Sequence, residues 1–222
     1  MIRCELALLQ KAYHSNVEFD YFHLLSGHDY PCRSAIEFDS FFDINRGRSF
    51  MHYDTDKQHA EWKEKISRRV NKWHLADTFV ERHLRLRRYA QAFLNRTFPR
   101  KFTGELYAGW NWFSWHRSLV AWILNYCDNH PEYLKRFHHT DCCDEVVFHT
   151  LLYSHIDELN IDRDNSLRYI DWFPDRPAAT LPLVLDERDF SKIINSDCLF
   201  CRKVRIPDSN LLLEQLDNRV SK

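Results

Sequence analysis

Three short polar segments contain the side chains best suited to chemistry. Residues 26–29 read SGHD, residues 141–145 read DCCDE, and residues 202–205 read RKVR after an apolar run. A carboxylate such as Glu145 can act as a general base, and cations such as Arg202 and Lys203 can neutralise a diphosphate without a metal ion. Each segment also has a structural interpretation: a turn, a helix start favoured by the helix dipole, and a solvated group of cations.

The loop that holds Ser26, Gly27 and Asp29 follows an apolar run at residues 21–25, which we predict to be a buried strand. Ligands of open α/β sheets gather beyond the carboxyl ends of strands, so this strand would deliver the loop to a binding site. The alternative is an ordinary turn in which Asp29 bonds its own backbone and Pro31 stiffens the exit.

Common motifs of nucleotide and metal sites have little support in this sequence. It contains no GxxxxGKS/T, GxGxxG or HExxH motif. The triplets at residues 54–56 (DTD) and 162–164 (DRD) have the DxD form that holds a divalent cation, but neither follows a strong apolar strand. The lone CxxC motif, at residues 198–201, lies in an apolar run and indicates buried thiols. The sequence therefore predicts neither a metal ion nor a cofactor.

The composition is that of a globular protein. The chain has 222 residues, 44% of them hydrophobic and 28% charged, and this length fits a single domain over residues 1–222. Its net charge of -1 gives no global field that would attract polyanions or a membrane, so any anion binding must be local. No window approaches the roughly 20 apolar residues of a membrane span, and the first residues lack the apolar core of a signal peptide. We therefore expect a cytoplasmic protein, with peripheral attachment to the inner membrane as the alternative for a bacterial chain.

Residues 82–101 form a basic segment with interspersed aromatic residues, the only sign of nucleic-acid binding in the sequence. On a helix these arginines would mostly cover the solvent-facing side. We favour that interpretation, so no nucleic-acid partner is predicted.

Helices and strands are predicted to alternate along the chain, which indicates α/β layering. Helices are expected at residues 2–13, 34–42, 62–73, 78–94, 119–127, 147–152 and 186–195, and a short one from residue 131. Ser34 and Glu37 form a capping box, and Asp141 or Asp144 is expected to cap the helix at residues 147–152. Strands are expected at residues 21–25, 46–53, 106–115, 167–172 and 199–204.

Five segments, in this order, resemble motifs of the core-2/I-branching β-1,6-N-acetylglucosaminyltransferase family, which also includes peptide O-xylosyltransferases and plant glucuronosyltransferases. They are residues 21–31 (YFHLLSGHDYP), 109–124 (GWNWFSWHRSLVAWIL), 144–152 (DEVVFHTLL), 167–172 (LRYIDW) and 196–204 (SDCLFCRKV). The resemblance implies an α/β, GT-A-like glycosyltransferase fold, a Rossmann-like layered sheet with flanking helices. The family's first strands, which build the nucleotide pocket, have no counterpart, so the chain looks truncated at its N-terminus.

The resemblance also implies the reaction, which is inverting, metal-independent transfer of a sugar from a UDP-sugar donor to a hydroxyl of a glycan acceptor. By resemblance, Glu145 is the catalytic base, Lys203 contacts the donor diphosphate with help from Arg202, and Trp172 lines the acceptor pocket. An inverting displacement needs a base opposite the leaving group, and sugar faces stack well on aromatic rings. The other residues assigned to the site are Ser26, Gly27 and Asp29 on the donor side and Trp112 on the acceptor side.

Three departures from the family pattern limit what the resemblance implies. The family's arginine before the final helix has no clean counterpart, because Thr180 occupies its place and Arg176 lies earlier. Residues 50–61 do not match the acceptor contacts of mucin-type members. Asn111 stands where xylosyl-type members have a carboxylate, which favours N-acetylglucosamine or a related hexose as the transferred sugar. The missing first strands leave an alternative function, that of a catalytically inactive truncated homologue that binds a glycan or a protein.

Overall fold

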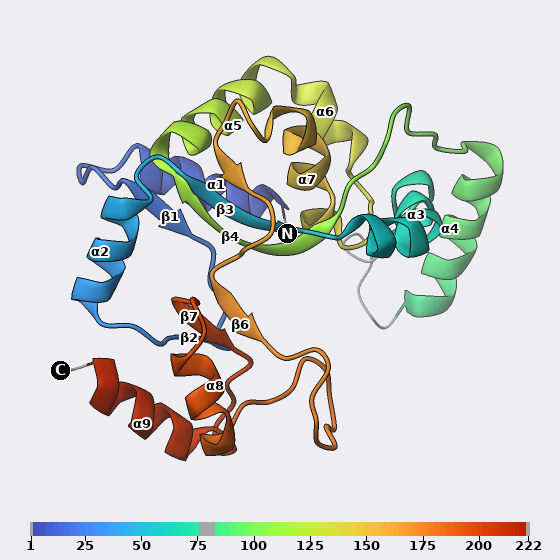
Figure 1. Ribbon diagram of the computed structural model, residues 1–222. Coiled ribbons are helices and arrows are strands. Elements are labelled where there is room, and N and C mark those ends of the chain that lie inside the picture. Colours follow the sequence, from blue (N-terminus) through green and yellow to red (C-terminus); the bar gives the residue numbers. More distant parts are fainter. Residues whose placement is uncertain (1, 76–82, 221–222) are drawn as a thin grey trace.

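The computed structural model describes residues 2–75 and 83–220, and helices and strands alternate along them. This confirms the mixed α/β class. No helix among these residues is both long enough and apolar enough to span a bilayer. The strands form two sheets, which lie in the upper and lower parts of Figure 1.

The first sheet has the strand order β1 (Tyr21–His23), β4 (Gly109–His116), β3 (Ser49–Tyr53) and β5 (Ile161–Asp162). Strands β1 and β3 run antiparallel to β4, and β5 runs parallel to β3. Side chains alternate between the two faces of a strand, and the apolar side chains of this sheet that belong to the main core lie on one face. Helices α1 (Ile2–Tyr13), α5 (Arg117–Asn129) and α7 (Val147–Leu152) cover this face and form the main core with it.

The second sheet has the order β2 (Asp29–Pro31), β7 (Phe200–Arg202) and β6 (Arg168–Ile170). Strand β2 runs antiparallel to β7, whereas β6 runs parallel to it. Helices α8 (Phe190–Ile194) and α9 (Asn210–Val220) pack against this sheet around a smaller core that contains Leu185, Ile193 and Leu212. The sequence analysis did not predict α9.

One buried arginine joins the two sheets. Arg168 of β6 is only 4% exposed, and its Nη2 donates to the carbonyl oxygens of Leu24 and Phe113, both at 2.9 Å. Its Nη1 donates to Ser114 Oγ at 3.0 Å and to the Ser166 carbonyl oxygen. Burial lowers the pKa of Arg168 to about 9. The guanidinium therefore binds the backbone at β1 and β4 from the opposite sheet.

Strand β4 contains a bulge in its first half. Met51 lies opposite Phe113 and Tyr53 lies opposite Gly109, so residues 110–112 of β4 stand opposite His52 alone. Extra residues in one strand bend it and redirect side chains, and such bulges are common beside active sites. Trp110, Asn111 and Trp112 therefore do not follow the simple alternation of the rest of the sheet.

Gly109, at the start of β4, is required because two groups approach its backbone closely. A Cβ atom there would lie 2.0 Å from the His52 carbonyl oxygen and 2.6 Å from His149 Nε2. His149 is fully buried, and burial lowers its pKa to about 3, so the imidazole is neutral and its Nε2 donates to the His52 carbonyl at 3.0 Å.

The remaining helices mostly agree with the predictions. The capping box of Ser34 and Glu37 is present at the start of α2 (Ala35–Ile44), and α6 (Pro131–Arg136) begins at its proline. Helix α3 (Asp56–Asn71) begins earlier than expected, because Thr55 and Gln58 form a second capping box that the sequence analysis overlooked. Helix α4 (Leu84–Thr97) matches part of the helix predicted at residues 78–94, and residues 78–82 lie outside the described residues.

The predicted cap of α7 is wrong. Residues 143–145 form a short 3-10 helix, η2 (Cys143–Glu145), and α7 begins after Val146 without a hydrogen bond from a capping side chain. Neither Asp141 nor Asp144 caps it. Asp144 is buried instead, and its Oδ2 accepts a hydrogen bond from Asn111 Nδ2 at 3.0 Å.

Replacing Arg168 by Met should lower the free energy of unfolding by about 3–5 kcal/mol, because the carbonyl oxygens of Leu24 and Phe113 lose their charged donor. The Phe113 oxygen keeps its hydrogen bond from the Leu24 N–H. Urea unfolding of the full chain measures this change. Arg85→Met, at an exposed position of α4, is the control and should change stability by less than about 0.5 kcal/mol. An equal loss in the two variants would contradict the role of Arg168.

Replacing Glu5 by Gln should change how stability depends on pH. Burial raises the pKa of Glu5 from 4.5 to about 7, and the nearby Asp144 carboxylate adds to this effect. Because the folded state holds the proton more tightly, this group destabilises the fold increasingly as the pH rises from about 4.5 to about 7. Relative to the wild type, Glu5→Gln should therefore gain about 2–3 kcal/mol between about pH 4.5 and about pH 8.

Urea unfolding at the two pH values tests this prediction, with Glu18→Gln at an exposed position as the control. A stability difference between Glu5→Gln and the wild type that does not vary with pH would show that Glu5 is not the group responsible.

Candidate active site

The predicted donor-side loop is closed by contacts to Arg202. Asp29 is the first residue of β2, and its fully buried carboxylate accepts from the Ser26 backbone N–H at 2.5 Å. Arg202 lies opposite Asp29 in β7, and its Nη1 contacts Asp29 Oδ2 at 3.5 Å and donates to Ser26 Oγ. The turn described above as the alternative interpretation is thus present, and Arg202 binds it. A Cβ on Gly27 would meet nothing within 4 Å, so the structure shows no steric need for glycine there.

Arg202 also contacts the first sheet. Its guanidinium carbon lies 4.1 Å from the ring centroid of Trp112, in the bulge of β4. Burial lowers the pKa of Arg202, and the Asp29 carboxylate partly offsets this shift. The sequence assigns Trp112 to the acceptor side, but the structure places it against Arg202, which the sequence assigns to the donor diphosphate.

Lys203 follows Arg202 at the end of β7. Its backbone N–H donates to the Leu183 carbonyl oxygen at 3.4 Å, and its carbonyl oxygen accepts from the Leu185 N–H at 2.9 Å. The half-buried side chain forms no ion pair within the described part of the chain. Arg176 differs in this respect, because it is bound to Asp189 at 2.5 Å and to Asp186 at 3.1 Å, and so serves the local structure.

The candidate base Glu145 lies in η2, and its side chain is 42% exposed. Its Oε2 accepts a hydrogen bond from Arg69 Nη1 of α3 at 2.6 Å. Burial raises the pKa of the neighbouring Asp54, and the charge of Glu145 raises it further. The carboxylate of Glu145 therefore lies within electrostatic range of Asp54 and is held by an arginine whose role the sequence does not reveal.

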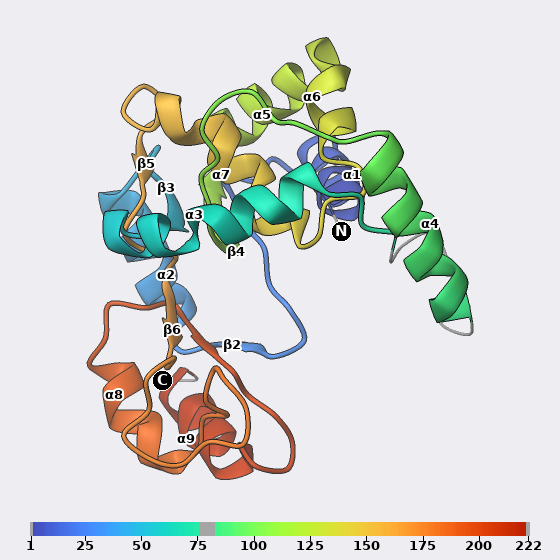
Figure 2. The same ribbon diagram turned by 90° about the vertical axis from the view of Figure 1, so that its right-hand side faces the viewer.

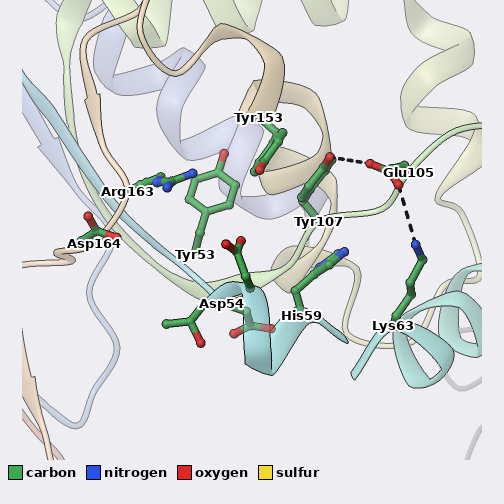
Figure 3. A pocket seen from close by; sticks show the side chains of 11 residues that line it. Tyr53, Asp54, His59, Lys63, Glu105, Tyr107, Tyr153, Arg163 and Asp164 are labelled. Carbon is green, nitrogen blue, oxygen red and sulfur yellow. Dashed lines mark hydrogen bonds and ion pairs between the residues drawn. The ribbon is translucent and has the colours of Figure 1, made fainter. Parts of the chain in front are cut away.

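Asp54 also lines a cavity of about 380 Å³, which Figure 3 shows. The cavity lies beyond the carboxyl ends of β3 and β5, and its walls carry residues of both DxD triplets. The sequence pattern gives these triplets little weight, but in the structure the first one directly follows β3, a largely buried strand. Within residues 2–75 and 83–220, no group of three or more His, Cys, Asp or Glu side chains is arranged to hold a metal ion.

Aromatic rings form one wall of this cavity. Tyr107 stacks on Tyr153 with 3.4 Å between the ring centroids and on His59 with 5.2 Å, and Figure 3 shows it between the two. The Tyr107 hydroxyl donates to Glu105 Oε2 at 2.7 Å, and the other oxygen of Glu105 lies 3.7 Å from Lys63 Nζ. A cavity with aromatic faces and paired hydrogen-bonding groups suits a polar ring such as a sugar.

A second aromatic group adjoins the bulge. Trp110 stacks on His52 with 4.1 Å between the centroids, and its ring centroid lies 6.4 Å from that of Trp172, the predicted acceptor residue. The Trp172 Nε1 atom is buried and has no hydrogen-bond partner among residues 2–75 and 83–220. Burial lowers the pKa of His52, and Asp164 of the cavity wall partly offsets this shift. His52, on which Trp110 stacks, is therefore within electrostatic range of a residue of the cavity wall.

The three residues of the bulge connect the predicted site residues. Trp110 lies near Trp172, Asn111 binds Asp144 beside Glu145, and Trp112 binds Arg202 beside Lys203. No hydrogen bond or ion pair within the described residues joins Glu145 directly to Lys203 or Arg202. Sequence reasoning missed Arg69 and Arg168, and it discounted Asp54 together with its triplet. A charged residue inside the apolar segment LRYIDW was the available sign of Arg168, because a cation in a buried strand must find partners.

The family model described as Core-2/I-Branching enzyme matches residues 1–194. A relative from Arabidopsis thaliana, the beta-glucuronosyltransferase GlcAT14A, is 25% identical over 208 residues, which are 91% of this chain and 43% of the relative. The chain thus spans less than half the length of this curated relative. Because the family match covers most of the chain, it confirms the resemblance found in the sequence, and the protein belongs to the Core-2/I-Branching enzyme family.

Proposed function

We propose that the protein is an inverting glycosyltransferase with a GT-A-like fold, which moves a sugar from a UDP-sugar to a hydroxyl of a glycan. Membership of the Core-2/I-Branching enzyme family supports sugar transfer in general. The observation that carries the finer proposal is the bulge of β4, because its residues contact the neighbours of both the candidate base and the candidate diphosphate cations.

In the proposed reaction, Glu145 takes the proton of the acceptor hydroxyl while that oxygen attacks the anomeric carbon of the donor. The bond between this carbon and the diphosphate oxygen breaks, and UDP leaves with the electron pair. Arg69 occupies Oε2 of Glu145, which leaves Oε1 to accept the proton. The contact with Arg69 also fixes the position of a side chain that is otherwise partly exposed.

The cations of β7 would stabilise the departing UDP in place of a metal ion. We assign this role first to Lys203, whose side chain forms no ion pair with another described residue, and second to Arg202. Arg202 already binds Ser26 and Asp29, so in this proposal it mainly holds the donor-side loop against β7. The positive charges thus act on the leaving group, where negative charge develops.

The acceptor glycan is proposed to lie between the tryptophan group and the 380 Å³ cavity. Trp172 and Trp110 offer ring faces, and Asp54 and Asp164 offer carboxylate oxygens for sugar hydroxyls. Asp54 connects this region with Glu145, because each carboxylate lies within electrostatic range of the other. An acceptor in this position would bring a hydroxyl toward the base.

The identity of the donor sugar rests on two conflicting indications. Asn111 favoured N-acetylglucosamine in the sequence analysis, but its amide is committed to Asp144 and so has less weight as a donor contact. The name of the Arabidopsis thaliana relative supports glucuronic acid. UDP-N-acetylglucosamine and UDP-glucuronic acid are therefore the two donors to compare in the assay.

Replacing Glu145 by Gln should lower kcat by about 10²–10⁴-fold, because it removes the base, and should leave UDP affinity unchanged. Turnover with both donors and isothermal titration with UDP measure the two effects. Glu61→Gln, an exposed change on α3, is the control and should alter neither quantity.

Two outcomes would contradict the proposal. Loss of UDP binding together with activity in Glu145→Gln would show that Glu145 has a structural role. A wild-type chain that binds no UDP would favour the alternative of an inactive homologue that binds a glycan or a protein.

A further inference from the structure

Helix α4 has an exposed outer face that the proposed transfer reaction does not use. No residue of the helix is buried, and both views place it at the edge of the molecule, leading away from the two sheets. Polar side chains attach it to the segment after α3. Asn95 Oδ1 accepts from the Trp73 N–H at 2.8 Å, and Gln91 Oε1 accepts from the Leu75 N–H at 3.3 Å.

The outer face combines an apolar stripe with arginines. Leu86, Tyr89 and Phe93 follow the spacing of one helix face and are 57%, 76% and 61% exposed. Arg85 and Arg96 are separated by about three helical turns, so they lie on the same side of the helix. That side borders the apolar stripe. The helix contains four arginines and no carboxylate. Large apolar side chains that gather on one exposed face mark an interaction surface.

Cations continue beyond the C-terminal end of α4. A cavity of about 450 Å³ there is lined by Trp73, Arg100, Lys101, Lys135, Arg136, His138 and His139. No carboxylate is among these described residues. Arg100 and Arg136 donate to backbone carbonyl oxygens at the end of α3, and burial together with the charge of Arg136 lowers the pKa of Arg100 to about 10. Positive charge is thus concentrated locally in a chain whose net charge is -1.

We propose that α4 and this cationic cavity dock the protein on an anionic membrane surface. A basic helix with one apolar face binds in the plane of a membrane interface, where its apolar side chains enter the boundary of the acyl chains and its cations meet the lipid phosphates. Leu86, Tyr89 and Phe93 supply the apolar part, and the arginines supply the charge. The proposal is independent of the transfer reaction, because it concerns binding alone.

Other partners match this surface less well. A nucleic acid would satisfy the arginines and offer bases to the aromatic rings, but it would leave the aliphatic Leu86 in water. A second copy of the chain would present the same arginines, so symmetric pairing through this face would bring like charges together. An anionic membrane satisfies both the apolar and the charged parts of the face.

The test is co-sedimentation of the full chain with vesicles of phosphatidylcholine alone and of phosphatidylcholine mixed with phosphatidylglycerol. The wild type should bind the mixed vesicles, and high salt should weaken this binding. Leu86→Ser/Phe93→Ser should lower the partition coefficient at least about tenfold. Arg85→Gln/Arg96→Gln should lower it about thirtyfold, because each cation contributes about 1 kcal/mol near an anionic surface.

The matched control is Leu8→Ser/Leu211→Ser, which removes two exposed leucines of other helices and should leave binding unchanged. All variants change exposed side chains, and circular dichroism checks that they fold. Equal binding by the Leu86→Ser/Phe93→Ser variant, or no binding of the wild type to mixed vesicles, would overturn the proposal. Salt-sensitive binding to single-stranded RNA without vesicle binding would assign the surface to nucleic acid instead.

Discussion

The arrangement of the site depends on a cation buried between two sheets. Arg168 brings a charge from β6 into the interior, where backbone carbonyls and a serine hydroxyl, most of them belonging to the other sheet, accept its hydrogen bonds. Removing a guanidinium from water costs several kcal/mol, so this side chain is stable only where all those acceptors are in place. The contact therefore fixes how β6 and β7 lie relative to β4. Because Trp172 follows β6 and Lys203 follows β7, the same contact sets the positions of two candidate site residues.

The bulge of β4 directs side chains of this strand toward several of the candidate site segments. A regular strand would send residues 110–112 alternately to the two faces of the sheet, whereas these three residues stand opposite His52 alone. They contact Trp172, Asp144 and Arg202, which belong to separate segments of the chain. Gly109 permits the close approach of His149 just before the bulge begins. The contacts that link β4 to Trp172, Asp144 and Arg202 thus depend on the local geometry of one strand.

Local patterns in the sequence predicted most elements but not the contacts between them. Helix α1 and the Ser34–Glu37 cap could be predicted because spacing and capping act within one segment. The expected cap of α7 failed because Asp144 is used by Asn111, a residue far away in the chain. Asp54 and Asp164 come from two triplets that seemed unimportant separately, and only the pairing of β3 with β5 brings them to one cavity. The family resemblance pointed to Glu145, but no local pattern indicated its partner Arg69.

We propose that the two sheets hold Glu145 and Lys203 on opposite sides of one bound donor. A crystal structure of the full chain with UDP would show both residues relative to the nucleotide. We predict a diphosphate in contact with Lys203 Nζ, a uracil beyond it, and the Glu145 carboxylate facing the open side of the β-phosphate. A UDP molecule bound away from Lys203, or a Glu145 carboxylate that faces away from the nucleotide, would contradict it.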